Sequence, residues 1–179
     1  MTRSAVIVVR SYSDEGQSFL KQIMRRLNGI LKVDAVSSIY KVQCEFERSS
    51  HPHDLRAVQI FEGLVVAVRG VFSAAAIDLK RRLDQAQSAL ESQSTHCSVS
   101  FRVVLFGDET LMLGDLTLPD PELHLRADLV IPAAEVAGPW IHPVFKTSVK
   151  QLAQKCAVRP WGEFVGQGQS LLDFSRNDQ

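Results

Sequence analysis

The sequence lacks a charge excess, a disulfide framework and any long hydrophobic run. Its 20 basic and 20 acidic residues cancel, so the net charge gives no reason to expect binding to nucleic acid or an anionic membrane. The three cysteines (Cys44, Cys97 and Cys156) are odd in number and far apart, which indicates free thiols in a reducing compartment. No apolar run approaches the roughly 20 residues of a membrane span, and we find no apolar leader segment. We therefore expect a soluble, cytoplasmic protein.

Common catalytic signatures are also missing from the sequence. It contains no phosphate-binding P-loop, dinucleotide fingerprint, nucleophile elbow or zinc spacing. His124 and His142 have no partners in the sequence, so we expect them to be surface or satisfied histidines rather than catalytic ones. The only histidine cluster is His51-Pro52-His53-Asp54, which is either a metal or anion site or, as we favour, a solvated loop.

Hydrophobic periodicity divides most of the chain into strands and helices. Continuous β-branched runs such as Val6 to Val9 predict buried strands, and apolar residues at three- and four-residue steps predict amphipathic helices. The order of the first six elements, βαββαβ, predicts an α+β domain with a mostly antiparallel, ferredoxin-like sheet. The expected strands are residues 4–10, 31–42, 57–68 and 98–106, and the expected helices are residues 15–29, 73–90, 126–136 and 147–157.

Local signals refine the boundaries of these elements. Ser13 or Asp14 is the expected N-cap of the first helix, and Ser73 is the expected N-cap of the second. The polar segment 44–54 is expected to be a loop. Two prolines in residues 116–121 predict a rigid, extended crossing segment.

The stretch from Ser98 to Val136 carries the functional information. Its first strand alternates, so that Ser100 and Arg102 share one face while Phe101 and its apolar neighbours form the face toward the core. The strand and turn that end at Gly107 are followed by Leu116-Thr117-Leu118-Pro119-Asp120-Pro121, and then by a helix with Arg126, Pro132 and Glu135.

This series of motifs resembles the 6-hydroxymethyl-7,8-dihydropterin pyrophosphokinase family of folate biosynthesis, of which the chain is identified as a divergent member. Ser37-Ser38-Ile39-Tyr40 resembles a further motif of the family, and the likeness covers about residues 4–149. The resemblance implies transfer of pyrophosphate from ATP to 6-hydroxymethyl-7,8-dihydropterin, with magnesium as cofactor. It also implies a second helical layer, which gives a three-layer α/β/α fold.

The chain departs from the family pattern at the positions that bind the metal and the pterin in the family. The two metal-binding aspartates of the family fall at Ser100 and Arg102, its proline-flanked histidine falls at Asp120, and its pterin-binding asparagine falls at Gly63. The arginine-rich loop of the family is reduced to residues 91–97, which contain no arginine. A dication about 5 Å from a guanidinium is repelled by on the order of 6 kcal/mol at an effective dielectric constant of about 20. We therefore expect no metal at this position.

Arg102 allows two interpretations. It could form a metal-free anion site with Arg126, because guanidinium groups bind phosphate directly. It could instead pair with Asp120 or Asp128, which we favour, since these acids stand where the family has histidine and phenylalanine. The basic run Lys80-Arg81-Arg82 is likewise either a phosphate site or, as we favour, a solvated helix face. The resemblance places the candidate ligand-binding residues at Ser37, Tyr40, Val42, Phe61, Gly63, Asp120 and Arg126.

Two functional classes follow from these departures. The chain is either an active pterin pyrophosphokinase with an altered site, which would need magnesium and ATP, or a catalytically degenerate relative that binds a pterin, a nucleotide or another protein. We favour the second class because the lost groups all belong to one site. We expect a pyrophosphokinase-like domain at residues 1–157 and a C-terminal extension at residues 158–179, which either packs on the domain or docks a partner.

Overall fold

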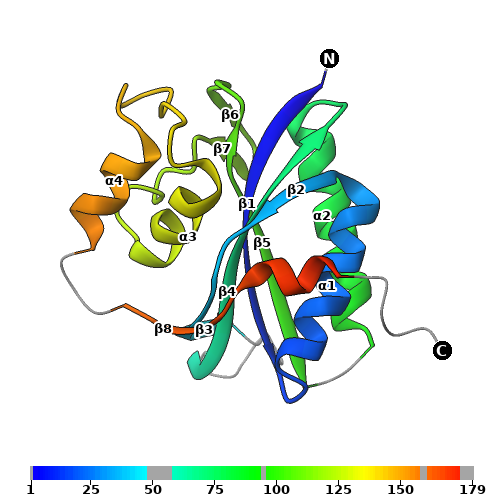
Figure 1. Ribbon diagram of the computed structural model, residues 1–179. Coiled ribbons are helices and arrows are strands. Elements are labelled where there is room, and N and C mark those ends of the chain that lie inside the picture. The colour runs from blue at the N-terminus through cyan, green and yellow to red at the C-terminus, as the bar shows by residue number, and fades with distance from the viewer. Residues whose placement is uncertain (1, 48–57, 94–95, 158–160, 174–179) are drawn as a thin grey trace.

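The strands of the chain form one main sheet with a helical layer on each face (Figure 1). The computed structural model describes residues 2–47, 58–93, 96–157 and 161–173. None of the helices in these ranges is long and apolar enough to cross a membrane. The elements are β1 (Arg3–Ser13), α1 (Gln17–Ile30), β2 (Lys32–Val36), β3 (Ile39–Glu47), β4 (Val58–Phe72), α2 (Ala76–Glu91), β5 (Cys97–Phe106), β6 (Leu111–Leu113), β7 (Leu116–Leu118), α3 (Ala127–Ala137), α4 (Val149–Cys156), β8 (Glu163–Gly166) and the 3-10 helix η1 (Gly168–Leu172).

The main sheet confirms the predicted ferredoxin-like arrangement. Its strand order is β5-β1-β4-β3-β8, β2 pairs with the second half of β4, and every pairing is antiparallel. The long strand β4 is therefore central, with β1 on one side and β2 and β3 in succession on the other.

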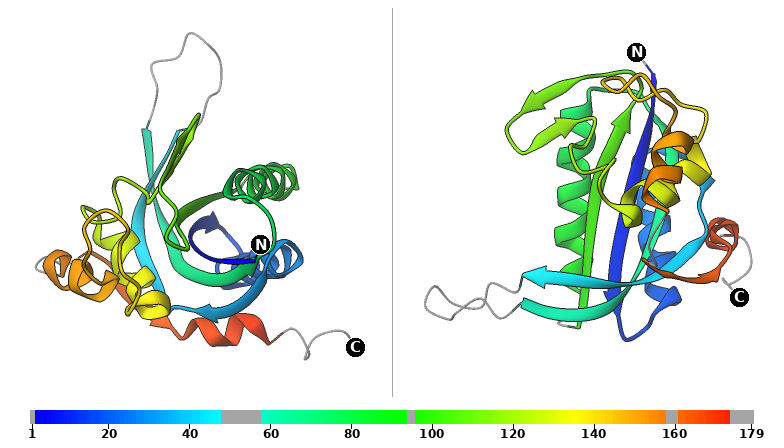
Figure 2. Two further views of the ribbon diagram at one scale, coloured as in Figure 1. Left: turned by 90° about the horizontal axis from the view of Figure 1, so that it is seen from above. Right: turned by 90° about the vertical axis from the view of Figure 1, so that its left-hand side faces the viewer.

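The two faces of the sheet build two separate cores, as the period-two pattern of β1 requires. Ile7 and Val9 point toward α1 and α2, whereas Val6 and Val8 point toward α3 and α4. The continuous apolar run in β1 thus reflects burial on both faces. Figure 2 shows the same layers from two further directions, with the curved sheet between the two pairs of helices.

Several predicted boundaries were wrong. The strand expected at 31–42 is interrupted at Ser37, whose backbone N–H and side-chain oxygen both bond to Ala67 of β4 (2.9 and 2.8 Å), and β2 and β3 lie on either side of it. The segment expected to be a loop from residue 44 continues β3 as far as Glu47. The N-caps are Gly16 and Ala75 rather than the predicted serines and aspartate, because β1 extends to Ser13 and α2 begins late.

Residues 116–121 were expected to form a rigid, extended crossing segment, but their first three residues belong to a hairpin. β6 pairs with β7, and Gly114 adopts a positive φ of 58° at the turn between them. Leu116 and Leu118 are buried, whereas Met112 is 83% exposed, so the hairpin buries one face only. Beyond the hairpin, the N–H of Asp120 bonds to the Val104 carbonyl (3.0 Å) and fastens the proline-flanked segment to β5.

The described part of the C-terminal segment lies on the domain. β8 adds an edge strand to β3, and η1 inserts Leu171, which is 1% exposed, into the core beside α1. The Trp161 ring contacts the Tyr40 ring with centroids 4.6 Å apart. The carbonyl of Ser37 lies against Gly168, so that η1 approaches the break between β2 and β3 closely.

Replacement of Gly168 tests this close approach. A Cβ at position 168 would overlap the Ser37 carbonyl oxygen and lie 2.7 Å from Val36 Cγ1, whereas a Cβ at Gly166 would meet nothing within 4 Å. We expect Gly168→Ala to lower the free energy of unfolding by ~1–3 kcal/mol, as overpacking does, measured by urea denaturation. Gly166→Ala is the matched control and should change it by less than about 0.5 kcal/mol. Equal effects of the two substitutions would contradict the packing of η1.

Candidate functional site

The face of β5 that carries Ser100 and Arg102 is turned toward α3. The neighbouring strand β1 places Arg10 directly opposite Ser100 and Val8 opposite Arg102. Val8 belongs to the core beneath α3, and the side chains of Arg10 and Arg102 alternate onto that same face. Cross-strand neighbours lie roughly 5 Å apart at Cβ. Two guanidinium-bearing residues therefore flank Ser100.

The guanidinium of Arg102 is held by two carboxylates. It donates two hydrogen bonds to Asp120, one from Nε to Oδ2 and one from Nη2 to Oδ1 (3.0 Å), which is a bidentate geometry. Its Nη2 also lies 2.7 Å from Glu122 Oε2. The Asp120 side chain is only 7% exposed, and its Oδ1 accepts the Glu122 N–H as well (2.9 Å).

Arg126 and Arg10 continue this network away from β5. Arg126 donates to Glu122 (3.2 Å) and, through two nitrogens, to Asp128 (3.2 and 3.0 Å). Asp128 also accepts a hydrogen bond from Arg10. The network therefore alternates in sign and contains equal numbers of arginines and acids. The favoured interpretation of Arg102 agrees with this geometry for Asp120, while Asp128 pairs with Arg10 and Arg126 instead.

The network favours the charged forms of Arg102 and Glu122. Burial opposes the charge of Arg102, but its bonds to Asp120 and Glu122 outweigh this effect and raise the pKa of Arg102. The hydrogen bond and charge of Arg102, followed by those of Arg126, lower the pKa of the Glu122 carboxyl. The pair of Arg102 and Arg126 therefore does not form the metal-free anion site of the other interpretation, because Glu122 lies between the two guanidinium groups.

The residues at this position do not fit a magnesium ion. Magnesium requires carboxylate, phosphate or water oxygens in a near-octahedral shell. Ser100 offers one neutral hydroxyl, Arg102 cannot coordinate a cation, and the Asp120 carboxylate is already engaged by Arg102. Among the residues that the structure describes, no group of three or more His, Cys, Asp or Glu side chains could hold a metal. The cluster at residues 51–54 lies outside the described residues.

A cavity of about 320 Å³ lies beside Arg102, between β5, β7 and α2. Lys80 of the basic run lines it and pairs with Asp84 (2.6 Å) and Asp115 (3.0 Å). These bonds outweigh burial and raise the pKa of Lys80, and Lys80 in turn lowers the pKa of Asp115. The next two residues of the basic run point elsewhere: Arg81 pairs with Asp78, and Arg82 lies over the Phe72 ring. The run therefore does not form a single phosphate site.

The candidate residues on the β3 side are engaged by the protein itself. The Ser37 hydroxyl bonds to the Ser38 carbonyl and the Ala67 N–H (both 2.8 Å). The Tyr40 hydroxyl donates to Glu135 of α3, and burial followed by this hydrogen bond raises the pKa of Tyr40 to about 12. Trp161 covers the Tyr40 ring, so the C-terminal segment lies over this part of the site.

Three further candidates, Val42, Gly63 and Phe61, lie on β3 and β4 near Tyr40. Val42 is 6% exposed and faces Gly63 across the β3–β4 pairing. The neighbouring Gly162 approaches Val42, since a Cβ there would lie 3.1 Å from Val42 Cγ1. Phe61 pairs with Cys44 in the same ladder. The structure thus groups Tyr40, Val42 and Gly63. The strand β8, which follows Trp161 in the chain, pairs with β3 beside this group.

One grouping of functional side chains was not predicted from the sequence. His124 and His142 were expected to be surface or satisfied histidines, which was wrong for His142, since it is 3% exposed and its Nε2 has no hydrogen-bond partner among the described residues. Both rings contact the Phe145 ring, with centroids 4.5 and 4.6 Å from it. Both line a second cavity of about 510 Å³, which shares Thr117, Asp120 and Pro121 with the first. Only the fold brings these histidines together, because 17 residues and the helix α3 separate them in the sequence.

Comparisons with known proteins identify the architecture. No model of a protein family matches the sequence, and no curated protein matches it. Among solved structures, HPPK-DHPS in complex with substrates matches 86% of this chain and 43% of its own, with a TM-score of 0.65 and 9% identity. Wild-type Plasmodium falciparum HPPK-DHPS with pteroate matches 87% of this chain and 42% of its own, with a TM-score of 0.62 and 10% identity.

The chain has the HPPK fold. HPPK abbreviates the pyrophosphokinase family that the sequence resembles, so the structure confirms the fold that this resemblance implied. The chain spans less than half the length of these two HPPK-DHPS structures. At 9% and 10% identity the likeness to HPPK extends to the architecture alone, and the residues of the site must carry the functional argument.

Loss of the Arg102 charge tests the network. We expect Arg102→Met to lower the free energy of unfolding by ~1–3 kcal/mol, because it leaves the buried Asp120 carboxylate without its main partner. NMR titration of the same variant should show the pKa of Glu122 moving up toward its usual value. The matched control Arg81→Met removes an exposed pair with Asp78 and should change stability by less than about 0.5 kcal/mol. An unchanged Glu122 pKa would contradict the network.

Proposed function

We propose that this protein is a non-catalytic relative of HPPK, which keeps the scaffold but does not transfer pyrophosphate from ATP to a pterin. One observation carries the proposal: Arg102, on the strand where the family places its metal aspartates, is tied bidentately to the buried Asp120. Phosphoryl-type transfer depends on metal ions that neutralise the phosphate oxygens. A guanidinium with carboxylate partners supplies no metal site.

The surroundings of Arg102 support the same conclusion. Arg10 adds a second fixed cation opposite Ser100, and its partner Asp128 belongs to the same network. Restoring a metal site would require Arg102 to leave Asp120 and the acids to lose their arginine partners together. The charges of the network are balanced without a metal, so they form a self-contained structural unit.

The remaining role of such a scaffold is binding. One candidate site for a pterin or nucleotide is the cavity beside Arg102 and Lys80, whose cations are both paired. A protein partner would instead meet the outer edge of the sheet, where Phe164 and Val165 of β8 are 56% and 37% exposed. Exposed apolar side chains on an edge strand suit strand-to-strand docking. We place the binding of a partner at β8 as the second candidate function.

An assay of AMP release tests the catalytic proposal. With ATP, magnesium and 6-hydroxymethyl-7,8-dihydropterin we expect no AMP above the rate without protein, because Ser100 and Arg102 cannot hold the metal where the family holds it. An active HPPK assayed in parallel shows that the reagents are competent, and circular dichroism shows that this chain is folded. Turnover close to that of the active HPPK would overturn the proposal and favour an active enzyme with an altered site.

A further inference from the structure

The second cavity contains a buried hydrogen-bond donor for which the described part of the chain provides no acceptor. His142 is 3% exposed, and its Nδ1 accepts the backbone N–H groups of Val144 and Phe145 (both 3.3 Å). A neutral imidazole that accepts at Nδ1 carries its proton on Nε2. The Nε2 atom is buried and has no hydrogen-bond partner among the described residues. Leaving such a donor unsatisfied is costly, which marks the site as one that a ligand can complete.

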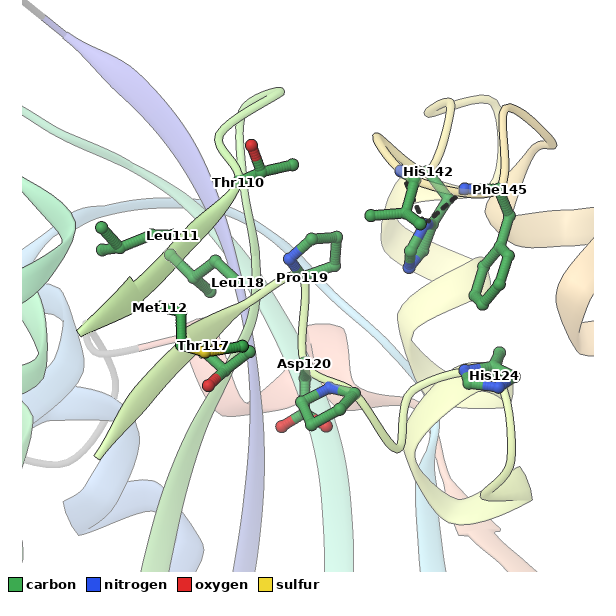
Figure 3. Close-up of a pocket in the computed structure, with 12 residues that line it drawn as sticks. Thr110, Leu111, Met112, Thr117, Leu118, Pro119, Asp120, His124, His142 and Phe145 are labelled. Atoms are coloured by element: carbon green, nitrogen blue, oxygen red, sulfur yellow. Dashed lines mark hydrogen bonds between the residues drawn. The ribbon is translucent and has the colours of Figure 1, made fainter. Parts of the chain in front are cut away.

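The ring of His142 is aimed away from its own loop. In Figure 3 it projects between Pro119 and Phe145, with Nδ1 toward the loop and the opposite edge toward the cavity. His124 stands on the far side of Phe145, and its Nδ1 is also buried without a partner in the described chain. Burial, followed by the charge of His124, lowers the pKa of His142, which favours the neutral imidazole.

The walls of the cavity select an apolar, flat ligand. Leu111, Leu118 and Pro119 form one side and Phe145 forms the other, and Val144 also lines the cavity. The volume of about 510 Å³ lies within the range of small-molecule sites. Aromatic and aliphatic surfaces of this kind favour a flat ligand with one aromatic ring or two fused rings.

The charges around the cavity exclude an anion. No lysine or arginine is among the residues that line it, and the one charged lining residue is Asp120, a carboxylate. The guanidinium that neutralises Asp120 lies on the side of the first cavity. A phosphate or carboxylate ligand would thus be desolvated beside an acid without a compensating cation.

From these observations we propose that the cavity between the β6–β7 hairpin and the loop of His142 binds a neutral heteroaromatic compound through a hydrogen bond from His142 Nε2–H to an acceptor on the ligand ring. The site shares Asp120 with the Arg102 network, but the proposal does not rest on the proposed loss of catalysis. We expect the cavity to exclude a nucleotide, because its phosphates would lie near Asp120 without a cation. We expect it to bind a neutral heterocycle of the size of a nucleobase.

Matched probes test the ligand chemistry. Isoquinoline carries a ring acceptor, naphthalene has the same shape without one, and naphthoate adds a negative charge. In NMR titrations at a pH where isoquinoline is uncharged, we expect saturable shifts at Leu111, Leu118 and His142, and about tenfold weaker binding of naphthalene. Naphthoate should bind more weakly than isoquinoline. Failure of isoquinoline to bind, or tighter binding of naphthoate, would overturn the proposal.

Two variants separate the hydrogen bond from the shape of the cavity. His142→Asn keeps an acceptor for the loop N–H groups but removes Nε2–H, so isoquinoline and naphthalene should bind it equally. Val144→Trp should fill the cavity and abolish binding, whereas Ile141→Trp, in the same exposed loop but outside the cavity lining, should not.

Long-range proton–nitrogen spectra report the tautomer of His142 directly. A proton on Nδ1 of His142, or a tenfold preference that survives His142→Asn, would refute the assigned donor.

Discussion

The bidentate ion pair between Arg102 and Asp120 fixes the part of the structure on which both cavities depend. Asp120 is buried, its N–H is bound to β5 and its carboxylate holds Arg102 and the following turn. It lines both cavities, with its partner guanidinium on one side and the histidines on the other. A single side chain thus determines which side of this segment carries positive charge and which remains apolar.

This pair is also the reason why we propose that the chain shares the architecture of HPPK without the chemistry of that family. The scaffold depends on apolar strands and helices, whose packing tolerates extensive change if pattern and volume are kept. The metal site depends on a few carboxylates at fixed positions. Replacing them with Ser100 and Arg102, and adding Arg10, reverses the sign of the charge that the strand presents. The acids Asp120, Glu122 and Asp128 then compensate for this reversal.

Much of this fold could be predicted from the sequence because its determinants are local. The β-branched run of β1 and the helical spacing of α1 and α2 indicate their secondary structure without knowledge of their neighbours. The pairing of Arg102 with Asp120 was one of two pairings predicted from the resemblance, because acids stand where the family has histidine and phenylalanine. The boundary at Ser37 failed because a distant partner sets it, since Ser37 interrupts its strand through a bond to Ala67. The hairpin of β6 and β7 was not predicted, although its strands are close together in the chain.

The second cavity could not be predicted, because its members come from separate loops. His142 becomes a fixed donor only when its own loop occupies Nδ1, and only burial removes its other nitrogen from water. Neither condition can be read from the sequence, in which His124 and His142 are isolated residues. Clefts assembled from loops on a rigid scaffold are common places for binding. In this protein the local sequence pattern predicts the scaffold, whereas the second cavity depends on tertiary contacts.

Calorimetric titration of the intact protein with manganese, in the presence of a nonhydrolysable ATP analogue, tests the central claim most directly. The ion pair of Arg102 with Asp120 predicts no saturable metal binding by the protein, that is, none beyond the chelation of manganese by the nucleotide analogue, which a titration without protein records. Saturable binding of metal ions that is lost on Ser100→Ala would show that the family's metal position still functions, and would contradict the loss of the metal site.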